Sequence, residues 1–314
     1  MNLTQLTVFR EVMKTGSMSD AARNLGRTQP AISLALKSLE DSLGMVLFDR
    51  DTRNLKPVPE AYYLLSEADS VLVQLTQLKR TMERLRVGDE GELHLVAMPG
   101  VSTVLLPEFL SVLLSTRPDI TLTLHTRSST QLRELVSSQG VDLGFGDYEA
   151  DHSRTLQTDV TKISANSFLA LPSAHPLAQS KTVSIKALSG EVIGTMHPDH
   201  VFEQRRHAAF AREGATTTVK VRSQTVVPLL RFVASGQCCA VVDPLTVASA
   251  GLLGETAEQV VFRPLDQPIR YNYAILVPKM RPQSALAGLV ATAWRDHVME
   301  TLHSLDAAPE LTQE

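Results

Sequence analysis

The chain of 314 residues is long enough for two or three domains, and its 43% hydrophobic and 20% charged residues are ordinary values for a globular protein. A net charge of −4 provides no overall basic field for nucleic acid, so any DNA contact has to come from a local patch. No apolar stretch approaches the roughly 20 residues that span a membrane, and the amphipathic segment 2–13 is unlike a signal peptide, which together predict a cytoplasmic protein without a membrane partner.

The first thirty residues predict two helices joined by a tight turn. Apolar side chains recur at three- and four-residue intervals from Leu3 to Met13, which is the pattern of a half-buried helix. Gly16 is expected to end this helix, and Ser17 or Ser19 can cap the next one by accepting backbone N–H groups.

A third helix is predicted to start after Thr28, with Pro30 in its first turn, where proline costs no hydrogen bond. One side of this helix is apolar through Ile32, Leu36, Leu39 and Leu43. The other side carries groups that can bond to base edges or phosphates in a major groove, namely Gln29, Ser33, Lys37 and Ser38. An ordinary helical bundle with a polar surface is the alternative, because a bare helix-turn-helix pattern occurs in many bundles.

Taken together, the spacing of these residues over 3–61 resembles the winged helix-turn-helix of LysR-type transcriptional regulators. The similarity continues more diffusely to about residue 300. The resemblance implies a recognition helix that begins near Gln29 and a wing over 48–57. It implies base contacts from Gln29, Pro30, Ser33 and Lys37, with Ser38 on the same polar face, and phosphate contacts from Thr28, Arg50, Arg53 and Lys56.

Two details refine this expectation. Residues 21–58 hold six Lys and Arg against four Asp and Glu, a weakly basic patch that suits a protein which gains DNA affinity by dimerising. The segment 56–61 is similar to the branch of the family that contains lysine-biosynthesis and opine-catabolism regulators. Val58 stands where that branch usually has threonine, so the following helix lacks that hydroxyl cap.

A long helix is predicted from Pro59 to Val87, about 40 Å at the standard helical rise. Its apolar residues alternate at spacings of four and three, as in a coiled-coil seam: Leu64, Ala68, Val71, Leu75, Leu78, Met82 and Leu85. Packing on its own domain is the alternative, but the strict repeat favours self-association into a dimer. Paired recognition helices then predict a partly palindromic operator in double-stranded DNA.

After a hinge at 88–91, strands alternate with helices, which predicts a mostly parallel, doubly wound α/β domain over 92–305. Breaks near Thr161 and Pro264 divide it into lobe I (92–161 and 265–305) and lobe II (162–264), and the polar tail 306–314 is predicted to be disordered. The whole is a multidomain α+β protein: a winged helix-turn-helix at 1–58, a linker helix at 59–87, and a two-lobed domain. The latter resembles the family's effector domain, which is similar to periplasmic solute-binding proteins.

Ligands of open parallel sheets bind beyond the carboxyl ends of the strands. The side chains predicted to bind an effector there are Ser102, Thr103, Ser128, Ser129, Asp147, Thr195, His197, Gln224 and Asp243. Helix capping is the alternative for each serine and for Asp243. The stretches 98–107 and 241–246 look like the opine and amino-acid branch, which implies an amino-acid-like effector, although Cys238 stands where the family usually has glycine.

Cys238 and Cys239 are adjacent in an apolar run and are expected to be buried thiols, since neighbouring cysteines rarely close an unstrained disulfide. No metal-ligand spacing is seen, and neither metal nor cofactor is predicted.

The resemblance implies a regulator in which a metabolite between the lobes changes the lobe angle and the geometry of a homodimer or homotetramer, and thereby the access of RNA polymerase. A solute-binding protein without DNA readout is the alternative. An enzyme is not expected, because no phosphate loop or nucleophile elbow is present.

Overall fold

The computed structural model describes residues 1–49, 55–87, 92–117, 120–148, 157–254, 258–280 and 282–313, with the backbone alone for 81–87, 252 and 253. The chain divides into two compact units, Met1–Gly88 and Asp89–Glu314, each with its own hydrophobic core. No helix within the described ranges is both long and apolar enough to cross a membrane.

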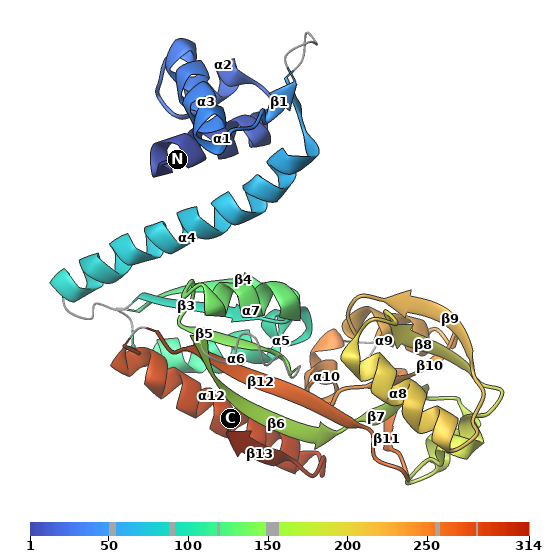
Figure 1. The fold of residues 1–314 in the computed structure, drawn as a ribbon. Helices are drawn as coiled ribbons and strands as arrows, with labels where there is room; N and C mark the ends of the chain where they lie inside the picture. The colour runs from blue at the N-terminus through green and yellow to red at the C-terminus, as the bar shows by residue number, and fades with distance from the viewer. Residues whose placement is uncertain are drawn as a thin grey trace. The chain divides into compact units, whose positions relative to one another are not determined.

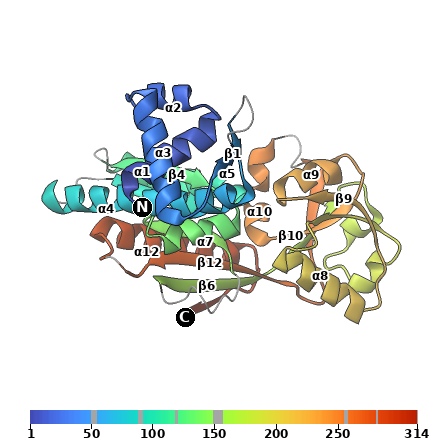
Figure 2. The same ribbon diagram turned by 45° about the horizontal axis from the view of Figure 1, so that its top comes forward.

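The first unit is a winged helix-turn-helix followed by one long helix (Figures 1 and 2). Its elements are α1 Leu3–Thr15, α2 Met18–Asn24, α3 Gln29–Leu43, β1 Phe48–Asp49, β2 Lys56–Pro57 and α4 Pro59–Val87. Gly16 ends α1 in the left-handed conformation that glycine adopts most easily, and the Ser17 hydroxyl accepts the backbone N–H of Asp20 to begin α2. The predicted helices and turn are confirmed.

The core of this unit lies between α1, α2, α3 and the start of α4. Phe9, Ile32 and Leu36 are fully buried, and the Phe9 ring meets Phe48 of the wing edge to face, with ring centroids 5.8 Å apart. Glu40 is buried beneath the wing, where its carboxylate accepts the backbone N–H of Leu47 at 2.8 Å. The wing is therefore attached to the helical core at its base.

Helix α4 uses part of its predicted seam inside its own unit. Of the seam, Ala68 is buried against the core and Leu64 packs against it, whereas Val71 and Leu78 are exposed. Leu72, which is not a seam residue, is buried there as well. The first half of the seam thus stabilises the unit itself. The side chains of Met82 and Leu85 lie outside the described residues.

The second unit contains two lobes, each built on a mixed sheet with helices on its faces (Figure 1). Lobe I has the strand order β13-β6-β12-β5-β3-β4. Its elements are β3 Glu92–Ala97, α5 Pro99–Thr103, α6 Leu105–Ser115, β4 Thr121–Thr126, α7 Ser129–Ser137, β5 Leu143–Asp147, β6 Thr158–Asn166, β12 Arg270–Pro278, α12 Ala285–Ser304 and β13 Glu310–Gln313. Trp294 of α12 is fully buried between Phe109 of α6 and Phe145 of β5.

Lobe II has the strand order β11-β7-β10-β8-β9. Its elements are β7 Phe168–Pro172, the 3-10 helices η2 Pro176–Gln179 and η3 Ile185–Leu188, β8 Val192–Met196, α8 Val201–Arg212, β9 Thr218–Ser223, α9 Val227–Ala234, β10 Cys239–Val242, α10 Pro244–Ser249, η4 Ala250–Leu253 and β11 Val260–Pro264. The Cys238 sulfur packs closely against Gly194 of β8. A Cβ at residue 194 would lie only 3.0 Å from that sulfur, so a glycine makes the approach possible.

Three features differ from the sequence predictions. The sheets are mixed rather than mostly parallel, because β12 runs antiparallel to β5 and β6, and β7 runs antiparallel to β10 and β11. The first crossing lies at Ser167, between β6 and β7, rather than near Thr161. The prediction of a disordered tail was wrong, since β13 pairs with β6 and supplies the edge strand of lobe I.

Helix α10 adds a further link between the lobes. It follows strand β10 of lobe II directly, yet it contacts α5, α6 and α12 of lobe I. The bend at Asp243 therefore takes the chain to lobe I, and the chain returns to lobe II before β11. The alternation of strands and helices in the sequence does not reveal these two additional crossings.

Candidate functional site

The first candidate site is the exposed face of α3. Gln29, Pro30 and Lys37 are exposed and Ser33 is half-buried, while the apolar residues of the helix face the core. Leu34 is the exception: it lies on the exposed face with 70% of its surface accessible, and it was not among the predicted DNA contacts. A methyl-bearing side chain here can contact a thymine methyl group, so the face offers both polar and apolar groups to a major groove.

Two of the predicted DNA contacts have a structural setting of their own. Ser38 accepts a hydrogen bond from the Gln5 amide at 2.8 Å, which ties α3 to α1. Thr28 is the N-cap residue of α3 and is exposed, but its side chain makes no capping hydrogen bond. The Thr28 hydroxyl is therefore not used to cap the helix and can bond to a DNA phosphate.

The wing carries the remaining basic candidates. Lys56 in β2 is exposed, opposite Asp49 in the two-stranded wing. Arg50 and Arg53 lie outside the described residues, so their roles stay predictions from the sequence.

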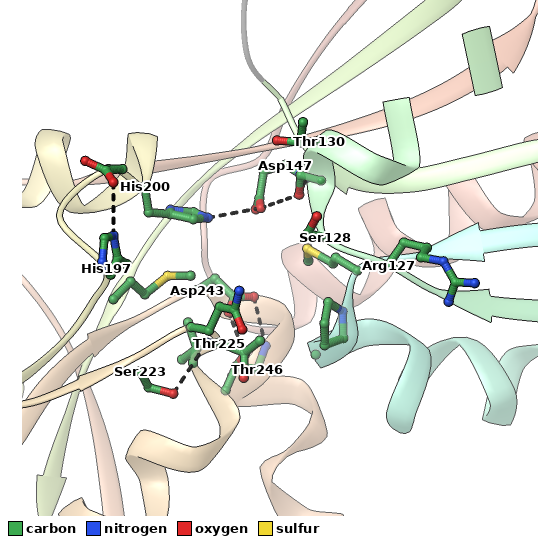
Figure 3. Close-up of a pocket in the computed structure, with 18 of the residues that line it drawn as sticks. Arg127, Ser128, Thr130, Asp147, His197, His200, Ser223, Thr225, Asp243 and Thr246 are labelled. Carbon is green, nitrogen blue, oxygen red and sulfur yellow. Dashed lines mark hydrogen bonds and ion pairs between the residues drawn. The ribbon is translucent and has the colours of Figure 1, made fainter. Parts of the chain in front are cut away.

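The second candidate site is a cavity of about 990 Å³ between the lobes of the second unit (Figure 3). Six of the nine predicted effector residues line it, namely Ser128, Ser129, Asp147, His197, Gln224 and Asp243. They come from the ends of strands in both sheets, as the strand-end rule predicts. A volume of this size holds a small metabolite.

Ser102, Thr103 and Thr195 do not line this cavity. The hydroxyls of Ser102 and Thr103 both donate to the Pro99 carbonyl within the short helix α5, and Ser102 also accepts from Thr126. Thr195 is buried and donates to the carbonyl of Met196. These hydroxyls donate to nearby backbone carbonyls, so Ser102 neither lines the cavity nor makes the N-cap that the sequence offered as the alternative.

Asp147, at the end of β5, is the most elaborately held group in the cavity. Its Oδ2 accepts from His200 Nε2 at 3.1 Å (Figure 3) and from the Ser129 hydroxyl at 2.6 Å. Its Oδ1 accepts from the Tyr271 hydroxyl. Burial opposes ionisation of this carboxyl, but the hydrogen bond and electrostatic attraction of His200, with the hydrogen bonds from Ser129 and Tyr271, outweigh it and lower its pKa from the ordinary aspartate value. Asp147 is therefore ionised at neutral pH.

Glycines in β5 allow this arrangement. A Cβ at Gly144 would lie 2.7 Å from a methyl of Val136, and one at Gly146 would lie 3.3 Å from the Ser129 hydroxyl. Helix α7 can approach the strand closely only because these Cβ atoms are absent, and this approach brings Ser129 to Asp147.

Asp243 marks the bend between β10 and α10. Its carboxylate accepts the backbone N–H of Thr246 at 3.0 Å, the Thr246 hydroxyl at 2.5 Å and the Tyr273 hydroxyl at 2.7 Å. Burial raises its pKa despite these bonds, with a further contribution from the charge of Asp147. The capping alternative for Asp243 is thus realised, and Tyr273 fastens the bend to lobe I.

Sequence reasoning missed His200, Tyr271 and Tyr273. The two tyrosines alternate with Asn272 on β12, so both point to the same side of the sheet, and both hydroxyls remain protonated because burial raises their pKa values well above 10. Such an alternation was a possible sequence signal, but nothing in the sequence placed this strand beside the two aspartates.

Cys238 and Cys239 are free, buried thiols, as predicted. Burial raises the pKa of Cys238 and raises that of Cys239 to about 12, so neither forms a thiolate readily. No group of three metal-ligating side chains occurs among the described residues.

Comparison with known proteins assigns both units. Residues 3–61 match the family described as bacterial regulatory helix-turn-helix protein, lysR family, and residues 86–302 match the LysR substrate binding domain. The chain is 28% identical to the regulatory protein NocR of Agrobacterium tumefaciens over 93% of this chain and 95% of the relative. It is 27% identical to the transcriptional activator LysR of Escherichia coli over 98% and 96%, and 30% identical to the octopine catabolism/uptake operon regulator OccR of Rhizobium meliloti over 78% and 80%.

Solved structures show the same fold. The regulator CbnR in complex with its target DNA superposes with a TM-score of 0.69 at 19% identity, over 96% of this chain and all of that one. Full-length OxyR C199D from Pseudomonas aeruginosa gives a TM-score of 0.62 at 19% identity, over 94% and 95%. The chain therefore belongs to the LysR family and is a DNA-binding transcriptional regulator with an effector-binding domain, not an enzyme.

Proposed function

We propose that this regulator acts in the cytoplasm, reads a partly palindromic operator as a homodimer or homotetramer, and takes an amino-acid-like effector into the cavity of its second unit. The observation that carries the DNA-reading part is the exposed face of α3, where Gln29, Leu34 and Lys37 project from a helix whose other side is buried. These groups can bond to base edges, contact a thymine methyl and neutralise a phosphate, respectively.

The second half of α4 supports the pairing. Val71 and Leu78 remain exposed and Leu75 half-buried, whereas the earlier seam residues Leu64 and Ala68 pack against the core. Pairing through this stripe would bring two α3 helices to successive major grooves about 34 Å apart. The operator would then contain two half-sites, and RNA polymerase bound beside it would respond to any change in the spacing or bend of the complex.

The effector part rests on the cavity and on relatives. OccR, 30% identical, is named for octopine catabolism, and the cavity here is lined by hydroxyls, carboxylates, histidines and two arginines beside apolar groups such as Met98 and Met196. An effector with several polar groups suits this lining. Its binding between the lobes would move one lobe relative to the other and so change the geometry of the paired subunits.

The test is selection of random duplex DNA by the purified full-length chain at two salt concentrations, followed by enrichment sequencing. We expect a motif with two related half-sites, and an affinity that falls as salt rises because phosphate contacts release counterions. Enrichment of no motif at either salt concentration would refute sequence-specific reading and favour a solute-binding protein without DNA readout.

A further inference from the structure

We propose that Asp147 receives a cationic nitrogen of the effector, and that His200 holds this position from the opposite lobe until the effector arrives. The inference rests on the proposed function, because it names the group through which the effector is recognised in the same cavity. Its basis is the juxtaposition of a buried carboxylate, three hydrogen-bond donors and a bridge between lobes (Figure 3).

Asp147 carries a negative charge at a largely buried position. Its side chain is 11% exposed and sits at the end of a strand inside lobe I. Taking an ionised carboxylate out of water is costly unless it is paired and hydrogen-bonded. A cationic group of the effector would add a charged partner to the hydrogen bonds that already hold this carboxylate.

Asp147 is bonded at present to two hydroxyl groups and one imidazole ring. Ser129 and Tyr271 donate hydroxyl protons. His200 accepts the backbone N–H of Phe202 at Nδ1, at 3.2 Å, and meets Asp147 through Nε2. The imidazole of His200 thus occupies one position on the carboxylate that a nitrogen of the effector could take.

The Asp147 carboxylate can accept a further hydrogen bond from an effector. A carboxylate offers about four acceptor positions, two on each oxygen. Oδ2 accepts from Ser129 and His200, and Oδ1 accepts from Tyr271. Among the described residues no second donor meets Oδ1, so a ligand N–H group can bond there. A charged donor can also take the place of His200, because hydrogen bonds to an ionised donor are the stronger ones.

Binding of the effector nitrogen at Asp147 would also change a contact between the two lobes. His200 caps α8 of lobe II, whereas Asp147, Ser129 and Tyr271 all belong to lobe I. Replacing the His200 bond by an effector nitrogen exchanges a direct contact between the lobes for one that passes through the ligand. The same event that recognises the cation thus changes how α8 is held against lobe I.

The experiment measures calorimetric binding of four probes to the full-length protein: L-arginine, L-lysine, 1,5-diaminopentane and the nitrogen-free dicarboxylate glutarate. We expect binding of at least one nitrogen-containing probe and none of glutarate. Asp147→Asn should weaken that binding about ten- to hundredfold, the loss expected for a hydrogen bond to a charged group. Asp296→Asn, an exposed carboxylate on α12, is the matched control and should bind as the wild type does.

His200→Asn separates the two roles of His200. Asparagine is a good N-cap and keeps the start of α8, but its shorter side chain does not reach Asp147. We expect this variant to bind the cationic probe as tightly as the wild type or tighter, because its competitor is gone. Thermal unfolding of each variant shows whether the fold is retained.

The outcomes separate the inference from the proposed function. Equal binding of glutarate, or wild-type affinity for the cationic probe in a folded Asp147→Asn variant, would overturn the role of Asp147 while an amino-acid-like effector stands. A tenfold loss in His200→Asn would show that His200 binds the effector rather than standing in for it. Absence of binding by all four probes would overturn the amino-acid-like effector and the inference together.

Discussion

The two units of this chain recognise their partners in opposite ways. In the first unit the groups that we propose face DNA follow one another along α3, from Gln29 to Lys37, so one helix would present that surface. In the second unit the cavity is assembled from strand and helix ends that are far apart in sequence, with Ser129, Asp147, His200 and Tyr271 meeting at one point. A local surface can be recognised from helical periodicity, whereas an assembled one requires the topology.

The largest expected effects come from the separate cores. Trp294→Ala should lower the free energy of unfolding of the second unit by about 3–5 kcal/mol, since it empties a fully buried site between Phe109 and Phe145. Phe9→Ala should do the same to the first unit. Calorimetry should show each substitution lowering one transition only. A single transition that both variants lower equally would show that the units do not fold separately.

Pairing through α4 comes next. Leu75→Lys places a charge in the stripe formed with Val71 and Leu78 and should weaken operator binding about a hundredfold, because two linked half-sites bind far more tightly than one. Sedimentation should show a lower mass for this variant. Gln74→Lys adds the same charge at an exposed position beside the stripe and serves as the control. An unchanged mass and operator affinity in Leu75→Lys would exclude this stripe from the dimer interface.

Asp243 tests the bend that fastens α10 to lobe I. Asp243→Ala should cost about 2–3 kcal/mol, because it leaves the N–H and hydroxyl of Thr246 without their acceptor. Asp243→Asn should cost less. Burial raises the pKa of Asp243, so its protonated form favours folding and the wild type should lose stability relative to Asp243→Asn as the pH rises from about 4 to 7. Urea unfolding at both pH values measures this, and the opposite trend would contradict the assignment.

The DNA surface predicts a smaller change that is confined to specific binding. Ser33→Ala should weaken binding to the selected operator by about 1–3 kcal/mol and leave binding to random duplex unchanged, if its hydroxyl contacts a base. Ser42→Ala is the control, because this serine of α3 donates to the carbonyl of Leu39. Fluorescence anisotropy with both duplexes gives the two affinities. Equal losses on both would show that Ser33 does not read sequence.

The smallest effect is expected at the two cysteines. Their burial and raised pKa values predict that peroxide changes operator affinity less than twofold, even though the fold is shared with OxyR. Anisotropy before and after oxidation, with mass spectrometry of the thiols, checks this. Rapid oxidation of Cys238 or Cys239 accompanied by altered DNA binding would contradict it.

The sequence predicted most of the fold because its local patterns are strong. The three short helices, the long α4 and the strand ends follow from periodicity, capping residues and glycines. It failed where pairing is non-local. Three features depend on contacts between residues more than a hundred positions apart: the direction of β12, the crossing at Ser167 and the pairing of β13 with β6. Such contacts cannot be detected in the pattern of a short sequence segment.

The site divides in the same way. Asp147 and Ser129 were selected because each follows a strand, and the structure brings them together. Ser102 and Thr103 follow a strand as well, but their hydroxyls bond to the Pro99 carbonyl, and residue type alone does not distinguish these cases. His200 was missed because it lies at a helix start in the other lobe, and only the tertiary structure places it at Asp147.

The measurement that tests the central claim most directly is operator affinity with and without a probe that binds the cavity, in the wild type and in Asp147→Asn. We predict that the probe changes wild-type affinity by about fivefold or more, the usual size of coupling between two sites, and leaves that of Asp147→Asn unchanged. An operator affinity that a cavity-bound probe does not alter would contradict control of DNA reading by this cavity.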